Sequence, residues 1–252
     1  MAGHSKWANI KHRKAAQDAK KGKVFTRLIR ELTVAARQGG SAPEDNPRLR
    51  AAIDKALSSN MTRDTIDRAV TRGAGNSDSD AMEELVYEGY GPDGVAILVE
   101  CMSDNRNRTV SEVRSAFNKH GGNLGTSGSV AFLFHKQGRL VLPAGIPEER
   151  VIEATLEAGA EDVQSQEDGT IEVVTTPEDF GPVRDALDQA GIEVTRSDVG
   201  MFPDSYSSIG DVETARRVVA LFERLEELDD VQNVYTNADF DSQVLDALEE
   251  AS

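Results

Sequence analysis

The sequence predicts an α+β fold in which an N-terminal three-helix basic domain is followed by two ferredoxin-like α/β domains, one inserted into the other. The first 75 residues carry apolar side chains at helical spacing, whereas strand-like runs alternate with helical segments after a glycine- and serine-containing linker at 73–80. The last predicted helix and strand find no partners in the domain that precedes them. At 252 residues, the chain has room for two or three hydrophobic cores of roughly 100–150 residues each.

Local capping signals define the three N-terminal helices. Apolar residues line one face of the first helix, at about 16–38, and the glycines at 39–40 mark its end. Asn46 followed by Pro47 is typical of an N-cap and a first-turn proline, and predicts the start of the second helix. Thr62 predicts the N-cap of the third helix.

The region after the linker begins with a predicted hairpin. Two strand-like runs at 85–90 and 95–102 are joined by proline, aspartate and glycine at 92–94. A helix at 109–119 and a strand at 129–134 follow. These elements are expected to form the first sheet-and-helix core.

A second group of elements follows the order strand, helix, strand, strand, helix, strand, which is the ferredoxin-like plan. Its members are predicted at 139–142, 147–158, 162–166, 170–175, 177–190 and 192–199. A further helix at 212–228 and a strand at 231–236 have no partners in this group, so we expect them to return to the first sheet. The predicted domains are a basic helical nucleic-acid-binding domain at 1–78, a discontinuous α/β domain at 79–135 plus 205–238, an inserted ferredoxin-like domain at 136–204 and an acidic tail at 239–252.

Charge is distributed unevenly along the chain. Residues 1–75 hold 16 Lys and Arg against 7 Asp and Glu, a net charge of +9. Residues 76–252 hold the remaining 12 against 37, a net charge of −25, and the two values add to the total of −16. A basic segment on an acidic chain is typical of a dedicated polyanion-binding part. The charge pattern therefore predicts nucleic-acid contact by the N-terminal region.

The candidate nucleic-acid-binding residues lie in the basic N-terminal tail and on one face of the first helix. On that helix, the arc of about 80° opposite the apolar stripe holds Lys23, Arg27, Arg30 and Arg37. Dense positive charge is favourable when phosphates replace condensed counterions. The set comprises Lys6, Trp7, Lys11, His12, Arg13, Lys14, Lys20, Lys21, Lys23, Arg27, Arg30 and Arg37.

Two parts of this prediction have a structural alternative. Trp7, the only tryptophan, either stacks on an unpaired base or packs back on the helices. Arg106 and Arg108 are secondary candidates for nucleic-acid contact, but helix capping by Thr109 or Asn107 explains part of their segment equally well.

The sequence gives little support for catalysis. The segment 89–94 matches G-x-G-x-x-G, but a strand follows it instead of a helix, which favours a hairpin turn. The glycine-rich segment 121–129 lacks the lysine of a phosphate-binding P-loop, so a structural turn is favoured over phosphate contact. The histidines and Cys101 have no metal-ligand spacing, and no serine lies in G-x-S-x-G. We expect no catalytic residue, metal or cofactor; a hydrolase acting at the glycine-rich segment and a protein-interaction scaffold are the alternatives.

Composition also bears on localisation. No stretch approaches the roughly 18 apolar residues of a membrane span, and the N-terminus lacks the apolar region of a secretory signal. The single cysteine, Cys101, lies in an apolar run and is expected to be a buried, unreactive thiol in a reducing compartment. A cytoplasmic protein without membrane contact is therefore expected.

Several motifs, read together, closely resemble the YebC/PmpR family across essentially the full chain. They are the segments 1–14 (MAGHSKWANIKHRK), 20–26, 87–92 (YEGYGP), 103–109 (SDNRNRT) and 121–134. The resemblance implies a cytoplasmic protein with a helical N-terminal domain and two α/β domains, and no enzymatic reaction. Family members are described as DNA-binding transcriptional regulators and as translation factors that relieve ribosome stalling at proline-rich stretches; the mitochondrial translational activator of cytochrome oxidase is similar. Asp93 stands where a glycine is common in the family.

The physical chemistry of the tail favours RNA over DNA as the partner. A basic tail with one aromatic residue suits irregular RNA with splayed bases, whereas duplex readout needs a helix with base-reading side chains in the major groove. The sequence therefore predicts a non-enzymatic translation factor that binds ribosomal RNA, with ribosomal proteins and tRNA as further candidate partners. Because the second and third helices are compatible with a helix-turn-helix, a transcriptional regulator that binds promoter DNA is the alternative.

Overall fold

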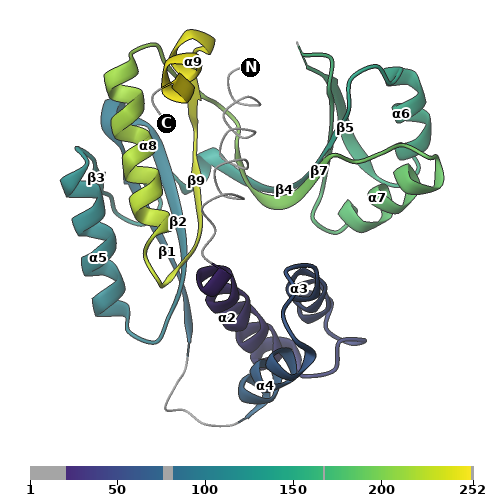
Figure 1. Cartoon of the computed structure of the whole chain (residues 1–252), viewed down its shortest axis with the longest axis horizontal. Helices are drawn as coiled ribbons and strands as arrows, with labels where there is room; N and C mark the ends of the chain where they lie inside the picture. Colours follow the sequence, from purple (N-terminus) through teal and green to yellow (C-terminus); the bar gives the residue numbers. More distant parts are fainter. Residues whose placement is uncertain (1–20, 76–81, 167, 251–252) are drawn as a thin grey trace. The chain divides into compact units, whose positions relative to one another are not determined.

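The structure, a computed structural model, describes residues 21–75, 82–166 and 168–250 (Figure 1). Within these residues the chain divides into two compact units. One unit contains the described residues up to 127 together with 217–234, and the other contains 128–216 together with 235–250. A helical region lies at the N-terminal end of the described residues, and helices with mainly antiparallel sheets follow it, so the predicted α+β class is confirmed.

Three helices form the N-terminal region: α2 (Lys21–Gly39), α3 (Pro47–Ser58) and α4 (Arg63–Ala74). Both predicted N-caps are confirmed. The Asn46 side chain accepts a hydrogen bond from the backbone N–H of Leu49 at 3.1 Å, and the Thr62 side chain accepts one from the N–H of Thr65 at 3.4 Å. Asn46 also donates to the carbonyl of Ala35 at 2.8 Å, so one buried amide joins the end of α2 to the start of α3.

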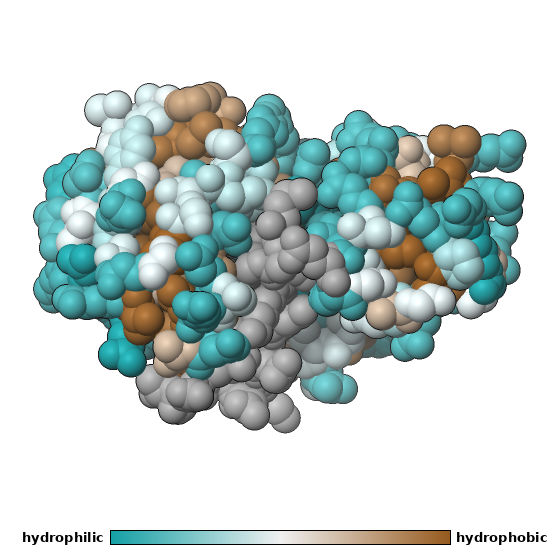
Figure 2. All heavy atoms as spheres, turned by 90° about the horizontal axis from the view of Figure 1, so that it is seen from above, coloured by the Kyte–Doolittle hydropathy of each residue, from teal (hydrophilic) through white to brown (hydrophobic). Residues whose placement is uncertain are grey.

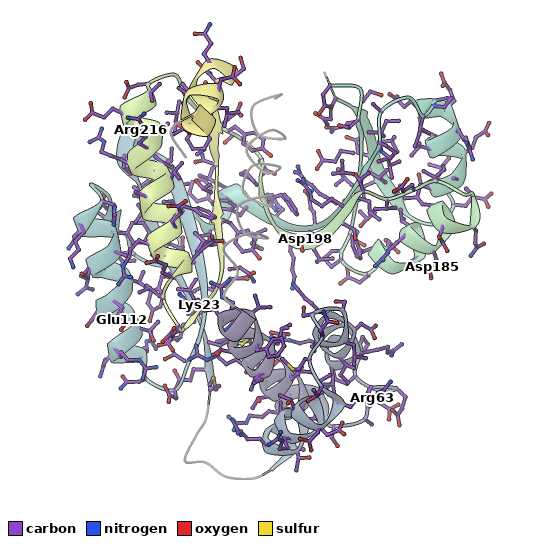
Figure 3. The ribbon with its side chains drawn as sticks, in the orientation of Figure 1. Lys23, Arg63, Glu112, Asp185, Asp198 and Arg216 are labelled. Carbon is purple, nitrogen blue, oxygen red and sulfur yellow. The ribbon has the colours of Figure 1, made fainter. Side chains whose placement is uncertain are left out.

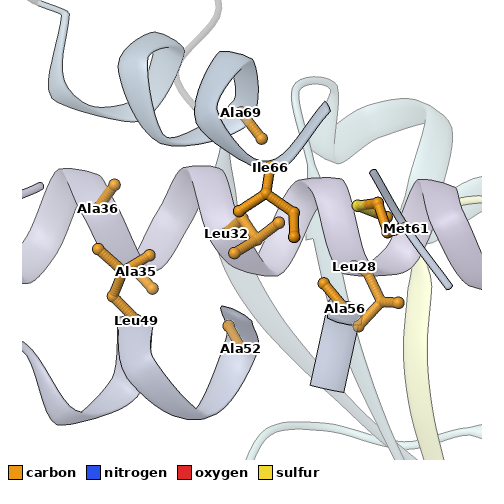
Figure 4. Packing of buried hydrophobic residues seen from close by; sticks show 10 residues of the cluster. All are labelled: Leu28, Leu32, Ala35, Ala36, Leu49, Ala52, Ala56, Met61, Ile66 and Ala69. Carbon is orange, nitrogen blue, oxygen red and sulfur yellow. The ribbon is translucent and has the colours of Figure 1, made fainter. Parts of the chain in front are cut away.

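The three helices enclose their own hydrophobic core (Figure 4). Its buried members are Leu28, Leu32, Ala35, Ala36, Leu49, Ala52, Ala56, Met61, Ile66 and Ala69. Gly73 of α4 lies close against α2, because a Cβ placed on it would lie 2.2 Å from the carbonyl oxygen of Thr33. The absence of a side chain at this position lets the two helices approach closely.

The first sheet has the strand order β3-β1-β2-β9. Its members are β1 (Glu83–Tyr90), β2 (Ala96–Ser103), β3 (Asn123–Leu124) and β9 (Val231–Thr236). The predicted hairpin of β1 and β2 is confirmed, and its turn contains a 3-10 segment, η2 (Pro92–Gly94). Asp93 adopts φ 59 there, in the left-handed region where a glycine is favoured. β9 lies beside β2 in this sheet. The expected discontinuous domain requires this pairing, because it brings a late segment of the chain back to the first sheet.

Two helices accompany this sheet: α5 (Arg106–Lys119) and α8 (Val212–Glu226). Phe117 of α5 is fully buried and packs over Gly89 of β1, where a Cβ would approach its ring to 2.7 Å. Leu221 of α8 is also fully buried and lies near Gly91, next to the hairpin turn. The helices and the sheet therefore share one core.

The strand predicted at 129–134 is wrong. The chain instead forms a 3-10 turn, η3 (Ala131–Leu133), closed by the N–H of Leu133 donating to the carbonyl of Val130 at 3.0 Å. The apolar alternation of this segment misled the prediction, because Val130 is buried while the side chain of Phe132 is 68% exposed. Regular pairing begins only at Phe134.

The second sheet has the order β5-β6-β4-β7, and its three pairings are antiparallel, as the ferredoxin-like plan requires. The elements are β4 (Phe134–Leu142), α6 (Glu148–Thr155), β5 (Ala160–Ser165), β6 (Ile171–Thr175), α7 (Phe180–Gln189) and β7 (Arg196–Pro203). The last strand was predicted at 192–199 but begins at Arg196, because Ile192 belongs to the turn that ends α7. Its N–H donates to the carbonyl of Leu187 at 2.9 Å and its side chain is buried.

The C-terminal residues, expected to form an acidic tail from 239, are folded as far as they are described. β8 (Ser207–Ile209) and β10 (Ala238–Phe240) pair in parallel, and the helix α9 (Ser242–Glu250) follows. Phe240, Val244 and Leu245 are buried. The apolar residues Val244 and Leu245 on one face of α9 indicate a packed helix, which the acidic composition of the segment did not suggest.

Candidate nucleic-acid interface

The predicted nucleic-acid-binding residues fall into two groups. Seven of them lie outside the described residues, and their contacts therefore stay a prediction: Lys6, Trp7, Lys11, His12, Arg13, Lys14 and Lys20. The other five primary candidates lie on α2: Lys21, Lys23, Arg27, Arg30 and Arg37. Lys21 is the first residue of this helix, and Arg37 lies half-buried in its last turn.

Three of the α2 cations contact the segment in which α8 ends. Lys23, which is labelled in Figure 3, donates to the backbone carbonyl of Glu227, and Arg27 donates to the carbonyl of Glu226. Arg30 donates to the carbonyl of Asp229. Only the carbonyl of Glu226 belongs to the last turn of α8, and those of Glu227 and Asp229 lie in the turn that follows the helix. A peptide carbonyl oxygen carries partial negative charge, and one without a partner within its helix or turn attracts cations. We call Lys23, Arg27 and Arg30 the cationic face of α2, and residues 226–230 the α8 terminus.

Arg30 makes further contacts besides the one with the carbonyl of Asp229. Its Nη1 lies 3.0 Å from Oδ1 of Asp230 and also donates to the carbonyl of Met102 at 3.0 Å. The side chain of Arg30 is 13% exposed and that of Asp230 only 2%. A buried carboxylate beside a nearly buried guanidinium forms an ion pair that water screens weakly.

Asp230 is the centre of a polar cluster in the first sheet-and-helix core. Its Oδ2 accepts hydrogen bonds from Thr109 at 2.7 Å, Arg108 at 2.8 Å and Ser103 at 3.0 Å. Burial by itself raises the pKa of Asp230, but these hydrogen bonds and the charge of Arg30 outweigh burial, so the pKa lies below its ordinary value. The carboxylate is therefore held ionised at neutral pH.

This cluster explains most of the segment 103–109. Arg108, a secondary candidate for nucleic-acid contact, binds Asp230 and also Asp104, at 2.8 Å. Neither Thr109 nor Asn107, the two caps considered for α5, is its N-cap. Asn105 caps this helix, because its side chain accepts a hydrogen bond from the N–H of Arg108 at 3.0 Å. Arg106, the other secondary candidate, is exposed at the start of α5.

The helical region presents further cations that the sequence prediction did not include. Arg50, Lys55, Arg63 and Arg72 of α3 and α4 are exposed, and Arg63 is labelled in Figure 3. Arg68 is also exposed but pairs with Asp64 at 2.6 Å. The prediction considered only the face of the first helix opposite its apolar stripe. The spacing of apolar residues in 47–74 could have predicted that these cations lie on the exposed faces of α3 and α4.

The described residues show no arrangement typical of a metal or membrane site. None of the His, Cys, Asp and Glu side chains in these ranges form a group of three that could hold a metal ion. No helix in the described part of the chain is long and apolar enough to cross a bilayer. Figure 2 shows hydrophobic residues interspersed among hydrophilic ones on one face of the molecule.

We expect Cys101 to be unreactive in the folded protein. The thiol is buried as predicted, and burial, together with the negative charges of Asp230 and Glu100, raises its pKa to about 12. Alkylation by iodoacetamide at about pH 8, followed by mass spectrometry, should be very slow in buffer and reach the rate of an ordinary thiol in denaturant. Equal rates in both conditions would contradict the buried environment.

Comparison with known proteins covers almost the entire chain. The family models "TACO1/YebC protein N-terminal domain" and "TACO1/YebC second and third domain" match residues 5–76 and 82–238. A "Probable transcriptional regulatory protein" from Chromohalobacter salexigens is 72% identical, with 99% of this chain and 100% of that protein covered. The "Transcriptional regulatory protein PmpR" of Pseudomonas aeruginosa is 61% identical, with 97% and 98% covered. The crystal structure of a conserved hypothetical protein from Aquifex aeolicus, 46% identical, matches with a TM-score of 0.77 over 89% of this chain and 93% of that chain.

Proposed function

The chain belongs to the YebC/PmpR family, and from that membership we propose that it is a non-enzymatic, nucleic-acid-binding regulator of gene expression in the cytoplasm. The observation that carries the proposal is the charge division, +9 in residues 1–75 against −25 in residues 76–252. An acidic body repels a polyanion, so nucleic acid binds the N-terminal region. The names of the relatives, as transcriptional regulatory proteins, support a role in gene expression.

RNA at the ribosome is the proposed target, and relief of stalling, for example at proline-rich stretches, is the proposed activity. The basic tail combines many cations with one tryptophan, a combination suited to unpaired bases and a bent backbone. The exposed cations of α3 and α4 add further positive charge to the N-terminal region. Promoter DNA is the second candidate target, because the relatives are named as transcriptional regulators.

Binding of single-stranded RNA is expected to be strongly salt-dependent. If the N-terminal region contacts about six phosphates, the logarithm of the affinity should fall against the logarithm of the salt concentration with a slope of roughly −4. Fluorescence anisotropy with a labelled RNA oligonucleotide, titrated at several potassium chloride concentrations, measures this slope. A slope near zero would reject the proposed phosphate contacts.

Neutralising the tail is expected to remove most of this binding. The test variant changes Lys11, Arg13, Lys14, Lys20 and Lys21 to glutamine, and the matched control changes Arg184 and Arg216, two exposed cations outside the basic region. The test variant should bind RNA weakly with a shallow salt slope, while the control should keep the wild-type slope. If the test variant still performs the cellular function, the protein-interaction scaffold becomes the better explanation.

Crosslinking in cells distinguishes the two targets. Ultraviolet crosslinking of the full chain, followed by sequencing of the attached nucleic acid, should recover ribosomal RNA, and it reports contacts with tRNA in the same experiment. Recovery of promoter DNA without ribosomal RNA would establish the transcriptional alternative. Ribosome profiling of a deletion strain then tests whether stalling at proline-rich stretches rises.

A further inference from the structure

The cationic face of α2 is already occupied within the chain. Lys23, Arg27 and Arg30 each donate to a backbone carbonyl of the α8 terminus, and Arg30 also pairs with Asp230. These are the same side chains that helical geometry sets opposite the hydrophobic stripe of α2. Resting on the proposed function, we propose that the α8 terminus competes with nucleic acid for this face and is displaced when phosphates bind there.

The chemistry of the two competing partners favours displacement. The carbonyl of Glu226 at the end of α8, and those of Glu227 and Asp229 in the turn after it, carry only partial negative charge, whereas each phosphate carries a full negative charge. The docked arrangement also leaves one donor unsatisfied, since the Nε of Arg27 is buried and no described residue accepts a hydrogen bond from it. An unpaired buried donor costs free energy that a phosphate oxygen would recover. The carbonyl contacts are therefore weaker partners for Lys23 and Arg27 than RNA, and Arg30 is the cation that a full charge, that of Asp230, holds.

The polar cluster shows why release of α2 leaves no unpaired carboxylate behind. Asp230 pairs with Arg30 from α2, but it is also bound by Arg108, Thr109 and Ser103 of the sheet-and-helix core. When Arg30 leaves, Asp230 keeps a cation and two hydroxyl donors, so its charge stays compensated. Asp230 thus holds the cationic face of α2 against the α8 terminus through Arg30, and its own charge stays compensated when Arg30 leaves.

Replacing Asp230 with asparagine tests this competition. The substitution removes the attraction for Arg30 while keeping the size of the side chain, so we expect labelled single-stranded RNA to bind about tenfold more tightly. Because three more cations become available, the salt slope should steepen by roughly 2. The matched control is Asp229→Asn, which removes the same charge from an exposed neighbour whose contact with Arg30 is through its backbone carbonyl.

The outcomes separate this inference from the proposed function. If D230N and D229N bind RNA equally, or if D230N binds no more tightly than the wild type, the competition is refuted while RNA binding is retained. If neither the wild type nor the variants bind RNA, the proposed function itself is refuted, and the competition with it. Should D230N fail to fold, hydrogen exchange on the wild-type chain decides: added RNA should speed exchange of the amides at 226–231, and unchanged or slower exchange overturns the inference.

Discussion

Asp230→Ala is expected to lower the free energy of unfolding by about 3–5 kcal/mol, the range found when one partner of a buried charge pair is removed. The carboxylate is 2% exposed and binds two arginines, one serine and one threonine. Its loss leaves the Ser103 hydroxyl without its acceptor and Arg30 without its counterion, while the Thr109 hydroxyl keeps the carbonyl of Asn105 at 3.0 Å. Urea unfolding followed by circular dichroism measures the change.

The control for this prediction is Asp229→Ala, at an exposed side chain one residue earlier. A substitution at such a site is expected to change stability by no more than about 0.5 kcal/mol. If both variants lose the same stability, the effect comes from general charge and not from the polar cluster.

The same cluster predicts how stability depends on pH. The pKa of Asp230 is lower in the folded protein than in the unfolded chain, so folding favours the ionised form. Its contribution is fully present above the unfolded pKa and is lost as the pH falls through the folded pKa, below about pH 4. The difference in unfolding free energy between the wild type and Asp230→Ala should therefore shrink in acid; a pH-independent difference would contradict the ionised state.

Gly73→Ala should destabilise the helical region by about 1–3 kcal/mol, the usual cost of overpacking. In an open helix the same change stabilises by up to about 1 kcal/mol, because alanine is the better helix former. At position 73 the added Cβ would lie 2.2 Å from the carbonyl oxygen of Thr33 and 2.9 Å from the Cβ of Ala36. The contact with α2 reverses the sign of the effect, which thermal or urea unfolding measures directly.

Gly181→Ala in α7 is the matched control, because nothing lies within 4 Å of the Cβ it would add. We expect this variant to be neutral or slightly stabilised. If Gly73→Ala behaves in the same way, α4 does not pack against α2 at the distance that the structure shows.

Local signals made much of the fold predictable. Asn46 and Thr62 were recognisable as caps because their hydrogen bonds reach only three residues ahead. The return of β9 to the first sheet followed from the absence of a free partner in the second group of strands. Errors arose where apolar residues served a turn instead of a strand, as at Val130 and Ile192.

The candidate site was less predictable, since its decisive contacts join distant parts of the chain. Helical periodicity showed which face of α2 is basic, but it contains no information about the segment that covers this face. Ser103 and Asp230 are separated by 127 positions in the sequence, and neither has a local pattern that marks it as a partner of the other. Only the folded structure brings the cationic face and the α8 terminus together.

The position of β9 in the first sheet constrains how the protein can be made. β2 ends at Ser103, yet its neighbouring strand spans Val231–Thr236, so synthesis must continue well past position 200 before that edge is covered. Chains emerge and fold from the N-terminus at about 5–20 residues per second, which leaves β2 with an open edge for several seconds. Nascent or prematurely terminated chains that stop before β9 therefore present a bare strand to their surroundings, and are the species on which chaperones would act.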